Sequence, residues 1–176
     1  MPDKVISTVR DWLESVVIEL NLCPFAKREL SNDRVRFAET EATNEVQLLQ
    51  ALETELERLC ASDSIETTLL IHPNVLADFE DYNQFLGLAD GLLVQMELDG
   101  VFQIASFHPH YQFADTQPDD AENYTNRSPF PLLHILREES LSRAIEHTPD
   151  VDQIPLRNIE KMNELGAKKL KLLFRR

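Results

Sequence analysis

Helical and strand patterns alternate along the middle of the sequence, and this alternation constrains the fold more than any other feature. Short apolar patterns typical of strands occur at residues 34–39, 67–73 and 101–107. Amphipathic helical patterns occupy residues 43–61 and 76–97 between them. Crossovers of this length favour parallel strand pairing. The sequence therefore predicts an α/β or α+β fold with a small, three-stranded sheet and mainly parallel β-α-β crossovers.

Further helical patterns flank this central unit. Residues 4–20 form one, residues 128–145 form a second that Ser128 caps, and residues 155–174 form a third. The sequence thus predicts about five helices. No internal repeat or linker divides the chain, so we expect a single domain over residues 1–176.

The composition is that of a globular protein with a strong acidic excess. The chain has 176 residues, 43% of them hydrophobic, and a formal net charge of −14. Duplex nucleic acid is a poor partner for it, because phosphate binding requires clustered cations. No apolar run approaches the ~20 residues that span a bilayer, and the first residues lack the order of a signal peptide. We expect a cytoplasmic protein with no membrane partner, and the sequence predicts no oligomeric state.

Histidines follow two of the predicted strands. His108 and His110 come directly after the strand at 101–107, in the stretch FHPHYQF, and His72 ends the strand at 67–73. In parallel α/β sheets, ligands bind beyond the carboxyl ends of the strands. If the strands are parallel, His72 and His108 leave the sheet on the same side. The sequence therefore predicts a site at this edge.

Two kinds of chemistry suit these histidines. Imidazoles bind zinc and similar divalent metals, and catalytic sites commonly use three protein ligands. His108 and His110 would supply two ligands, and His72 or Asp115 the third. A metal-free pair would instead act in general acid–base catalysis. The structural alternative is that the histidines only satisfy neighbouring polar groups.

The loop after these histidines carries candidate substrate-binding residues. Asn123, Asn126 and Arg127 lie near its end, and Ser128 caps the helix predicted to follow. Free amides at a helix N-terminus, together with an arginine, suit a phosphate or carboxylate. Tyr111 adds an aromatic contact. The sequence thus predicts a small anionic substrate, and the alternative is simply a well-capped helix.

A cysteine in the stretch NLCPFAK is a second candidate catalytic group. If Pro24 opens a short helix, Cys23 lies at its N-terminus, where the helix dipole favours the reactive thiolate. Lys27 and Arg28 add positive charge nearby. Cys23 is then a nucleophile or a redox group, and the alternative is a buried cysteine in a turn.

The stretches NLCPFAK, FHPHYQF and NRSPFPLLHILRE together resemble a bacterial family known as a domain of unknown function, number 1415. The resemblance covers nearly the whole chain and implies a short, single-domain protein. Its motif positions include Cys23, His108, Asn126, Arg127 and His134. It implies no reaction, cofactor or partner.

Three functional hypotheses follow from these residues. The first is a small enzyme that hydrolyses or transfers a group of a small anionic substrate at a His/Arg-lined pocket, with or without a metal. The second is a non-catalytic module that binds a ligand or protein through the aromatic loop at residues 107–131. The third is a thiol-dependent redox protein that uses Cys23.

Overall fold

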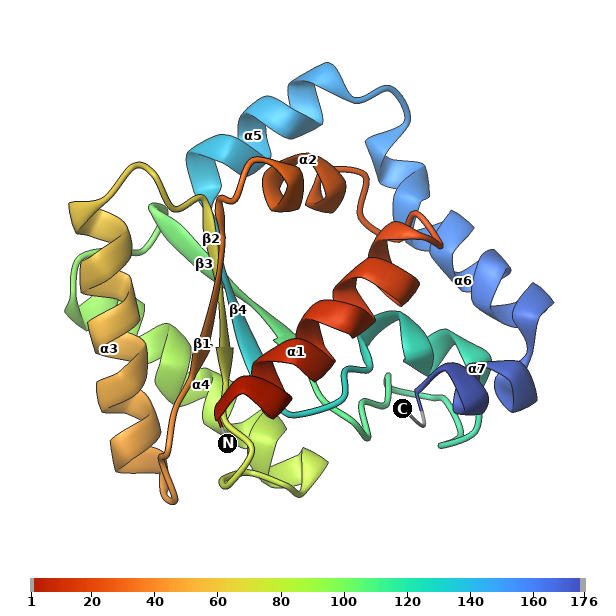
Figure 1. Cartoon of the computed structure of the whole chain (residues 1–176), viewed down its shortest axis with the longest axis horizontal. Helices are drawn as coiled ribbons and strands as arrows, with labels where there is room; N and C mark the ends of the chain where they lie inside the picture. Colours follow the sequence, from red (N-terminus) through yellow and green to blue (C-terminus); the bar gives the residue numbers. More distant parts are fainter. Residues whose placement is uncertain (1, 175–176) are drawn as a thin grey trace.

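A four-stranded mixed sheet forms the centre of the molecule (Figure 1). The computed structural model describes residues 2–174. The order across the sheet is β1-β2-β4-β3. The strands are β1 (Val35–Glu39), β2 (Thr67–Ile71), β3 (Phe102–Phe107) and β4 (Leu132–Arg137). The fold class is mixed α/β as predicted, with one strand more than the sequence indicated.

The pairing of the strands differs from the predicted, mainly parallel sheet. β1 and β2 pair in parallel, and α3 (Glu45–Ala61) connects them as expected. β4 lies between β2 and β3 and pairs with both in antiparallel fashion. The prediction is therefore wrong for two of the three pairs of neighbours. Because β2 and β3 both oppose β4, the first three strands nevertheless run in the same direction.

The additional strand, β4, was predicted to be part of a helix that begins at Ser128. In the structure, residues 132–137 are extended, and a helix, α5 (Glu138–His147), begins only after them. β4 is buried on both faces, since Leu132 packs in one core and Leu133 and Ile135 in the other. Such a strand has a continuous apolar run, which sequence periodicity does not separate from a buried helix.

The remaining helices outnumber the five that were predicted. Their bounds in the described residues are α1 (Pro2–Trp12), η1 (Leu13–Ile18, π-helical), α2 (Ala26–Ser31), α4 (Phe79–Gln95), η2 (Ala121–Asn126, 3-10), η3 (Val151–Gln153, 3-10), α6 (Ile154–Leu165) and α7 (Ala167–Leu173). Asn44 and Asp78 cap α3 and α4 through side-chain oxygens. Within residues 2–174, no helix is both long and apolar enough to span a membrane.

Helices cover both faces of the sheet and create two hydrophobic cores (Figure 1). α3 and α4 pack on one face, with Leu52 and Phe85 fully enclosed. α1, η1, α6 and α7 lie on the other side, with Val16 and Met162 in that core. The carboxyl ends of β2 and β3 therefore meet the N-terminal end of α4 at one edge of the sheet.

Gly87 and Gly91 lie four residues apart on α4, a spacing that on a helix can allow close packing against a neighbouring element. Both residues are exposed, and a Cβ atom built at either one would meet nothing within 4 Å. These glycines therefore make no close approach to another element, because α4 turns this face outward.

Candidate anion-binding site

Two of the predicted site histidines lie together at one edge of the sheet. His72 follows β2 and His108 follows β3, and the side chain of Tyr82 from α4 contacts both. The Tyr82 ring centroid lies 5.8 Å from that of His72 and 5.0 Å from that of His108. The expected convergence is therefore confirmed. These three side chains and the loop at residues 108–128 are called the strand-end region below.

Three of the four ring nitrogens of His72 and His108 have internal partners. His108 Nε2 donates to Leu76 O (3.0 Å), and His108 Nδ1 accepts from the amide of His110 (3.0 Å). His72 Nδ1 donates to Val75 O, whereas His72 Nε2 is buried and has no hydrogen-bond partner within the described residues. A nitrogen that accepts an amide hydrogen carries no proton of its own, so the His108 ring is neutral. Burial lowers the pKa of His108 and lowers that of His72 to about 4.

The predicted metal ligands are not assembled. Across residues 2–174, no three His, Cys, Asp or Glu side chains form a group that could hold a metal ion. His108 uses both ring nitrogens on backbone groups, and only the backbone amide of His110 takes part in that network. Asp115 is exposed, in a left-handed turn of the loop. The structure thus gives a divalent metal no support from the four predicted ligands.

Two of the predicted substrate-binding residues, Asn123 and Asn126, form hydrogen bonds that stabilise the loop. Asn123 is fully buried; its Oδ1 accepts from the Phe113 amide and from Thr116 Oγ1, and its Nδ2 donates to Gln117 O. Asn126 Nδ2 donates to Ser106 O at the end of β3. These hydrogen bonds explain why so long a loop has a defined conformation.

Arg127 has a comparable structural role. Its Nε donates to Tyr111 O (3.1 Å) and one terminal nitrogen donates to Pro118 O (2.6 Å). The guanidinium carbon lies 4.4 Å from the centroid of the Tyr124 ring. The planar group that was predicted to bind an anion is therefore engaged by two backbone carbonyls and an aromatic face.

The helix N-terminus that was to complete this pocket does not exist. No helix begins at Ser128, and its hydroxyl donates to Phe130 O instead. His134 lies in the middle of β4 rather than one turn into a helix, with Nε2 2.7 Å from Thr67 Oγ1. The prediction of a helix N-terminus at Ser128 is therefore wrong, because the chain continues as a strand.

Tyr111 lies in an aromatic cluster on the strand-end region. Its ring centroid is 5.0 Å from those of Phe79 and Phe113. All three side chains are half-buried. The predicted aromatic contact surface thus has much of its area already packed.

Cys23 lies on a turn between η1 and α2. Its side chain is half-buried and packs at the margin of the core beneath α1 and α6. α2 begins at Ala26, three residues after Cys23, so the cysteine is outside the first helical turn. The predicted effect of the helix dipole on this thiol therefore loses its geometric basis, since that effect is confined to the terminal turn.

A cleft opens beside this turn, between it and α6. Its volume is about 350 Å³. Three segments line it: the NLCP turn, the loop after α5, and the first turns of α6. The lining residues are Leu20, Asn21, Pro24, Thr148, Pro149, Ile154, Arg157, Asn158 and Lys161. We call it the α6 cleft. Pockets for small molecules typically begin at about this size.

The charges of the α6 cleft have one sign. Arg157 and Lys161 line it, whereas the lining residues described include no carboxylate. Neither cation forms an ion pair with another residue in the described range 2–174. Asn158, between them, donates to Leu22 O (2.8 Å) and so fastens α6 to the NLCP turn. The arrangement offers free positive charge in a concave site.

Sequence reasoning identified the turn but not these cations. Arg157 and Lys161 are four residues apart, with Glu160 and Glu164 three residues after them. In a solvated helix that pattern predicts local ion pairs, which would cancel the charge. The tertiary position of α6 is needed to see that both cations face a cleft.

Comparisons with known proteins identify a family but no function. Neither the curated proteins nor the solved structures gave a match. A family model described as a protein of unknown function (DUF1415) matches residues 4–172, which confirms the resemblance carried by the three motifs. The chain therefore belongs to the DUF1415 family.

Proposed function

We propose that this protein binds a small anionic molecule in the α6 cleft. The observation that carries the proposal is the pair of unpaired cations, Arg157 and Lys161, in a concave site whose described lining has no carboxylate. The two cations line this cleft although the whole chain has an acidic excess, with a formal charge of −14. The anionic ligand predicted from the sequence is retained, with a different set of residues.

The spacing of the two cations suggests the form of the ligand. Side chains four residues apart on a helix have Cβ atoms about 5–6 Å apart. Two linked anionic groups, as in a diphosphate or a short dicarboxylate, match this distance. Leu20, Pro24 and Ile154 form an apolar side of the cleft, which suits a carbon skeleton between or beside the charges.

Titration calorimetry at low ionic strength tests the proposal, with inorganic pyrophosphate and succinate as probes. We expect saturable binding of at least one probe by the wild type. The double variant Arg157→Gln/Lys161→Gln should lose about tenfold or more in affinity, because each charge-assisted contact contributes more than ~1 kcal/mol. Glutamine is unbranched and polar and has a helix propensity similar to that of lysine and arginine, so α6 should remain folded.

A second double variant controls for the change in net charge. Lys168 and Lys169 of α7 are exposed and lie outside the α6 cleft. Lys168→Gln/Lys169→Gln removes the same charge and should change the affinity less than twofold. Equal losses in the two variants would show a general electrostatic effect, and no binding by the wild type would overturn the proposal.

A further inference from the structure

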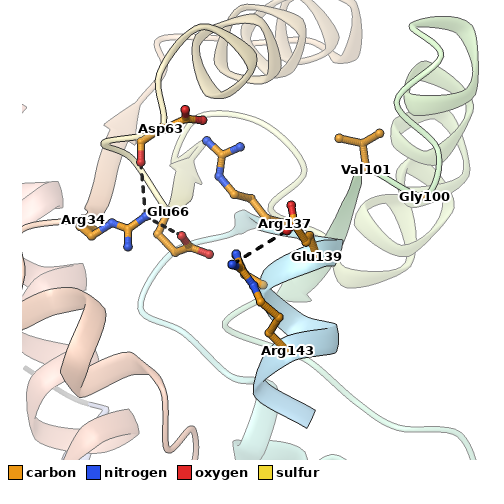
Figure 2. Close-up of a pocket in the computed structure, with 9 residues that line it drawn as sticks. Arg34, Asp63, Glu66, Gly100, Val101, Arg137, Glu139 and Arg143 are labelled. Atoms are coloured by element: carbon orange, nitrogen blue, oxygen red, sulfur yellow. Dashed lines mark hydrogen bonds and ion pairs between the residues drawn. The ribbon is translucent and has the colours of Figure 1, made fainter. Parts of the chain in front are cut away.

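A second cleft lies next to the N-terminal end of α5, at the edge of the sheet opposite to the strand-end region. Its volume is about 410 Å³, and we call it the α5 cleft (Figure 2). In contrast to the α6 cleft, its lining contains charges of both signs. Some of these charges are paired within the protein and others are not. The unpaired charges are the ones that a ligand could contact.

One wall of the α5 cleft is fixed by internal hydrogen bonds. Arg34 donates to Glu66 at 2.8 Å, and the Glu66 side chain is only 15% exposed. Arg137 donates to backbone carbonyls in the last turn of α3 and just after it, those of Leu59, Ser62 and Ile65. These two arginines are therefore structural, and Glu66 is held in a defined position.

The charge on the other wall has no strong partner. Arg143 lies 3.9 Å from Glu139, a distance too long for a hydrogen bond, and their side chains are 64% and 83% exposed. Such a pair contributes little, since exposed ion pairs are worth about 0–1 kcal/mol. The donors of Arg143 are thus available to a ligand.

Glu66 and Arg143 face one another across the cleft. In Figure 2 the carboxylate and the guanidinium point toward each other from the two walls. Glu66 uses Oε2 for Arg34, and in the described part of the chain its Oε1 makes no hydrogen bond. The two groups do not pair with each other within residues 2–174. A ligand with both a positive and a negative group would satisfy both walls.

The cleft also contains an apolar contact surface. Val101, the residue before β3, lines it and is 47% exposed. Gly100 lies beside it, and a Cβ atom built there would meet nothing within 4 Å. Val101 therefore supplies an exposed apolar surface in the same cleft as the two opposite charges, on the far side of Arg137 in Figure 2.

We propose that the α5 cleft binds a free α-amino acid with an apolar side chain. The ammonium group of the ligand contacts Glu66, its carboxylate receives hydrogen bonds from Arg143, and its side chain packs on Val101. This site is independent of the α6 cleft, with which it shares no lining residue.

Binding of four related compounds tests the assignment, followed through amide NMR shifts of the full chain. Leucine should bind and shift the amides around the cleft. N-acetyl-leucine lacks the positive charge and leucinamide lacks the negative one, so each should bind about tenfold more weakly or worse. Glycine lacks the apolar side chain and should also bind more weakly than leucine.

Substitutions test the charged contact and the apolar contact of the site separately. Arg143→Gln should weaken leucine binding about tenfold, whereas Arg28→Gln on α2, an equally charged change at an exposed residue, should not. Val101→Thr should reduce the preference for leucine over glycine. Equal binding of leucine and N-acetyl-leucine, or no saturable binding of leucine by the folded wild type, would overturn the proposal.

Discussion

The strand-end region and the α6 cleft differ in what their polar groups do. At the strand ends, His108, Asn123 and Arg127 use their polar side-chain atoms in hydrogen bonds within the protein, mostly to backbone groups. At the α6 cleft, Arg157 and Lys161 have no ionic partner among the described residues. The first region has the residue types of an active site, and the second has unused binding capacity. Residue type alone therefore does not locate a site.

Burial explains the difference. His108 and Asn123 are fully buried, and a buried polar group without a partner costs about 1–3 kcal/mol. The fold must satisfy such groups internally, and the loop at residues 108–128 is built around them. Arg157 and Lys161 are exposed, so water solvates their charges and no internal partner is needed.

The largest effect that tests this comparison is acid destabilisation of the strand-end region. The pKa of His72 is about 4 in the folded protein and near 6.5 when solvated, so the unfolded chain binds a proton first as the pH falls. The stability that neutral His72 contributes is complete above pH 6.5 and is lost progressively toward pH 4. The part of this loss that comes from His72 should reach about 3 kcal/mol in urea unfolding across that range, and His134, whose pKa is also lowered to about 4 by desolvation, adds a second contribution.

Two histidine variants isolate this contribution. Asn at position 72 retains a donor for Val75 O but does not titrate. His72→Asn should therefore reduce the slope of the free energy of unfolding against pH by the equivalent of about one proton. His147, exposed on α5, serves as the control, and His147→Asn should leave the slope unchanged. A wild type equally stable at pH 6.5 and pH 4.5 would contradict the role given to His72.

A crossed pair of arginine substitutions gives the next largest effect. Arg127→Ala should lower the free energy of unfolding by about 2 kcal/mol, because it releases Tyr111 O, Pro118 O and the Tyr124 ring. It should leave pyrophosphate affinity within about twofold. Arg157→Ala should instead weaken pyrophosphate binding and change the free energy of unfolding by less than about 0.5 kcal/mol. Urea unfolding gives the free energy of unfolding of each variant, and calorimetry gives its affinity for pyrophosphate.

The crossed pattern is the informative result. If Arg127→Ala abolished anion binding while the protein kept its stability, the loop arginine would be a ligand contact and the comparison would be reversed. If both variants lost stability alone, the α6 cleft would have no demonstrated ligand role.

The smallest effect concerns access to Cys23. Pro24 lines the α6 cleft, so an anion bound there should hinder the approach of a reagent to the adjacent thiol. Pyrophosphate should slow alkylation of Cys23 by neutral iodoacetamide a few-fold, followed by mass spectrometry. Cys60, exposed at the end of α3, is an internal control whose rate should not change. Equal alkylation rates at Cys23 with and without a saturating anion would show that an anion in the α6 cleft does not shield this thiol.

Much of the fold could be predicted from periodicity. The strands at residues 35–39, 67–71 and 102–107 and the helices between them lie where the patterns placed them, to within a few residues. The convergence of His72 and His108 also followed, because the strands that precede them run in the same direction. β4 was missed, since an apolar run that is buried on both faces has no alternation to distinguish it from a helix.

The candidate site was less predictable. The sequence singled out Cys23 in the NLCP turn, and it predicted an anionic ligand at Arg127 and at a helix N-terminus at Ser128. Both assignments depended on residues 128–145 being helical. Once β4 enters the sheet, Ser128 and Arg127 approach a strand, and their donors turn to nearby carbonyls.

The sequence by itself determined most of the local structure: which segments other than β4 form the main helices and strands, and that a mixed α/β fold encloses an apolar core. These depend on side-chain period and backbone preference, which act over neighbouring residues. Tertiary structure alone decided where β4 inserts and which polar groups remain free. Both depend on contacts between distant segments, such as Asn158 with Leu22 and Arg137 with Ile65, and no local pattern encodes those contacts.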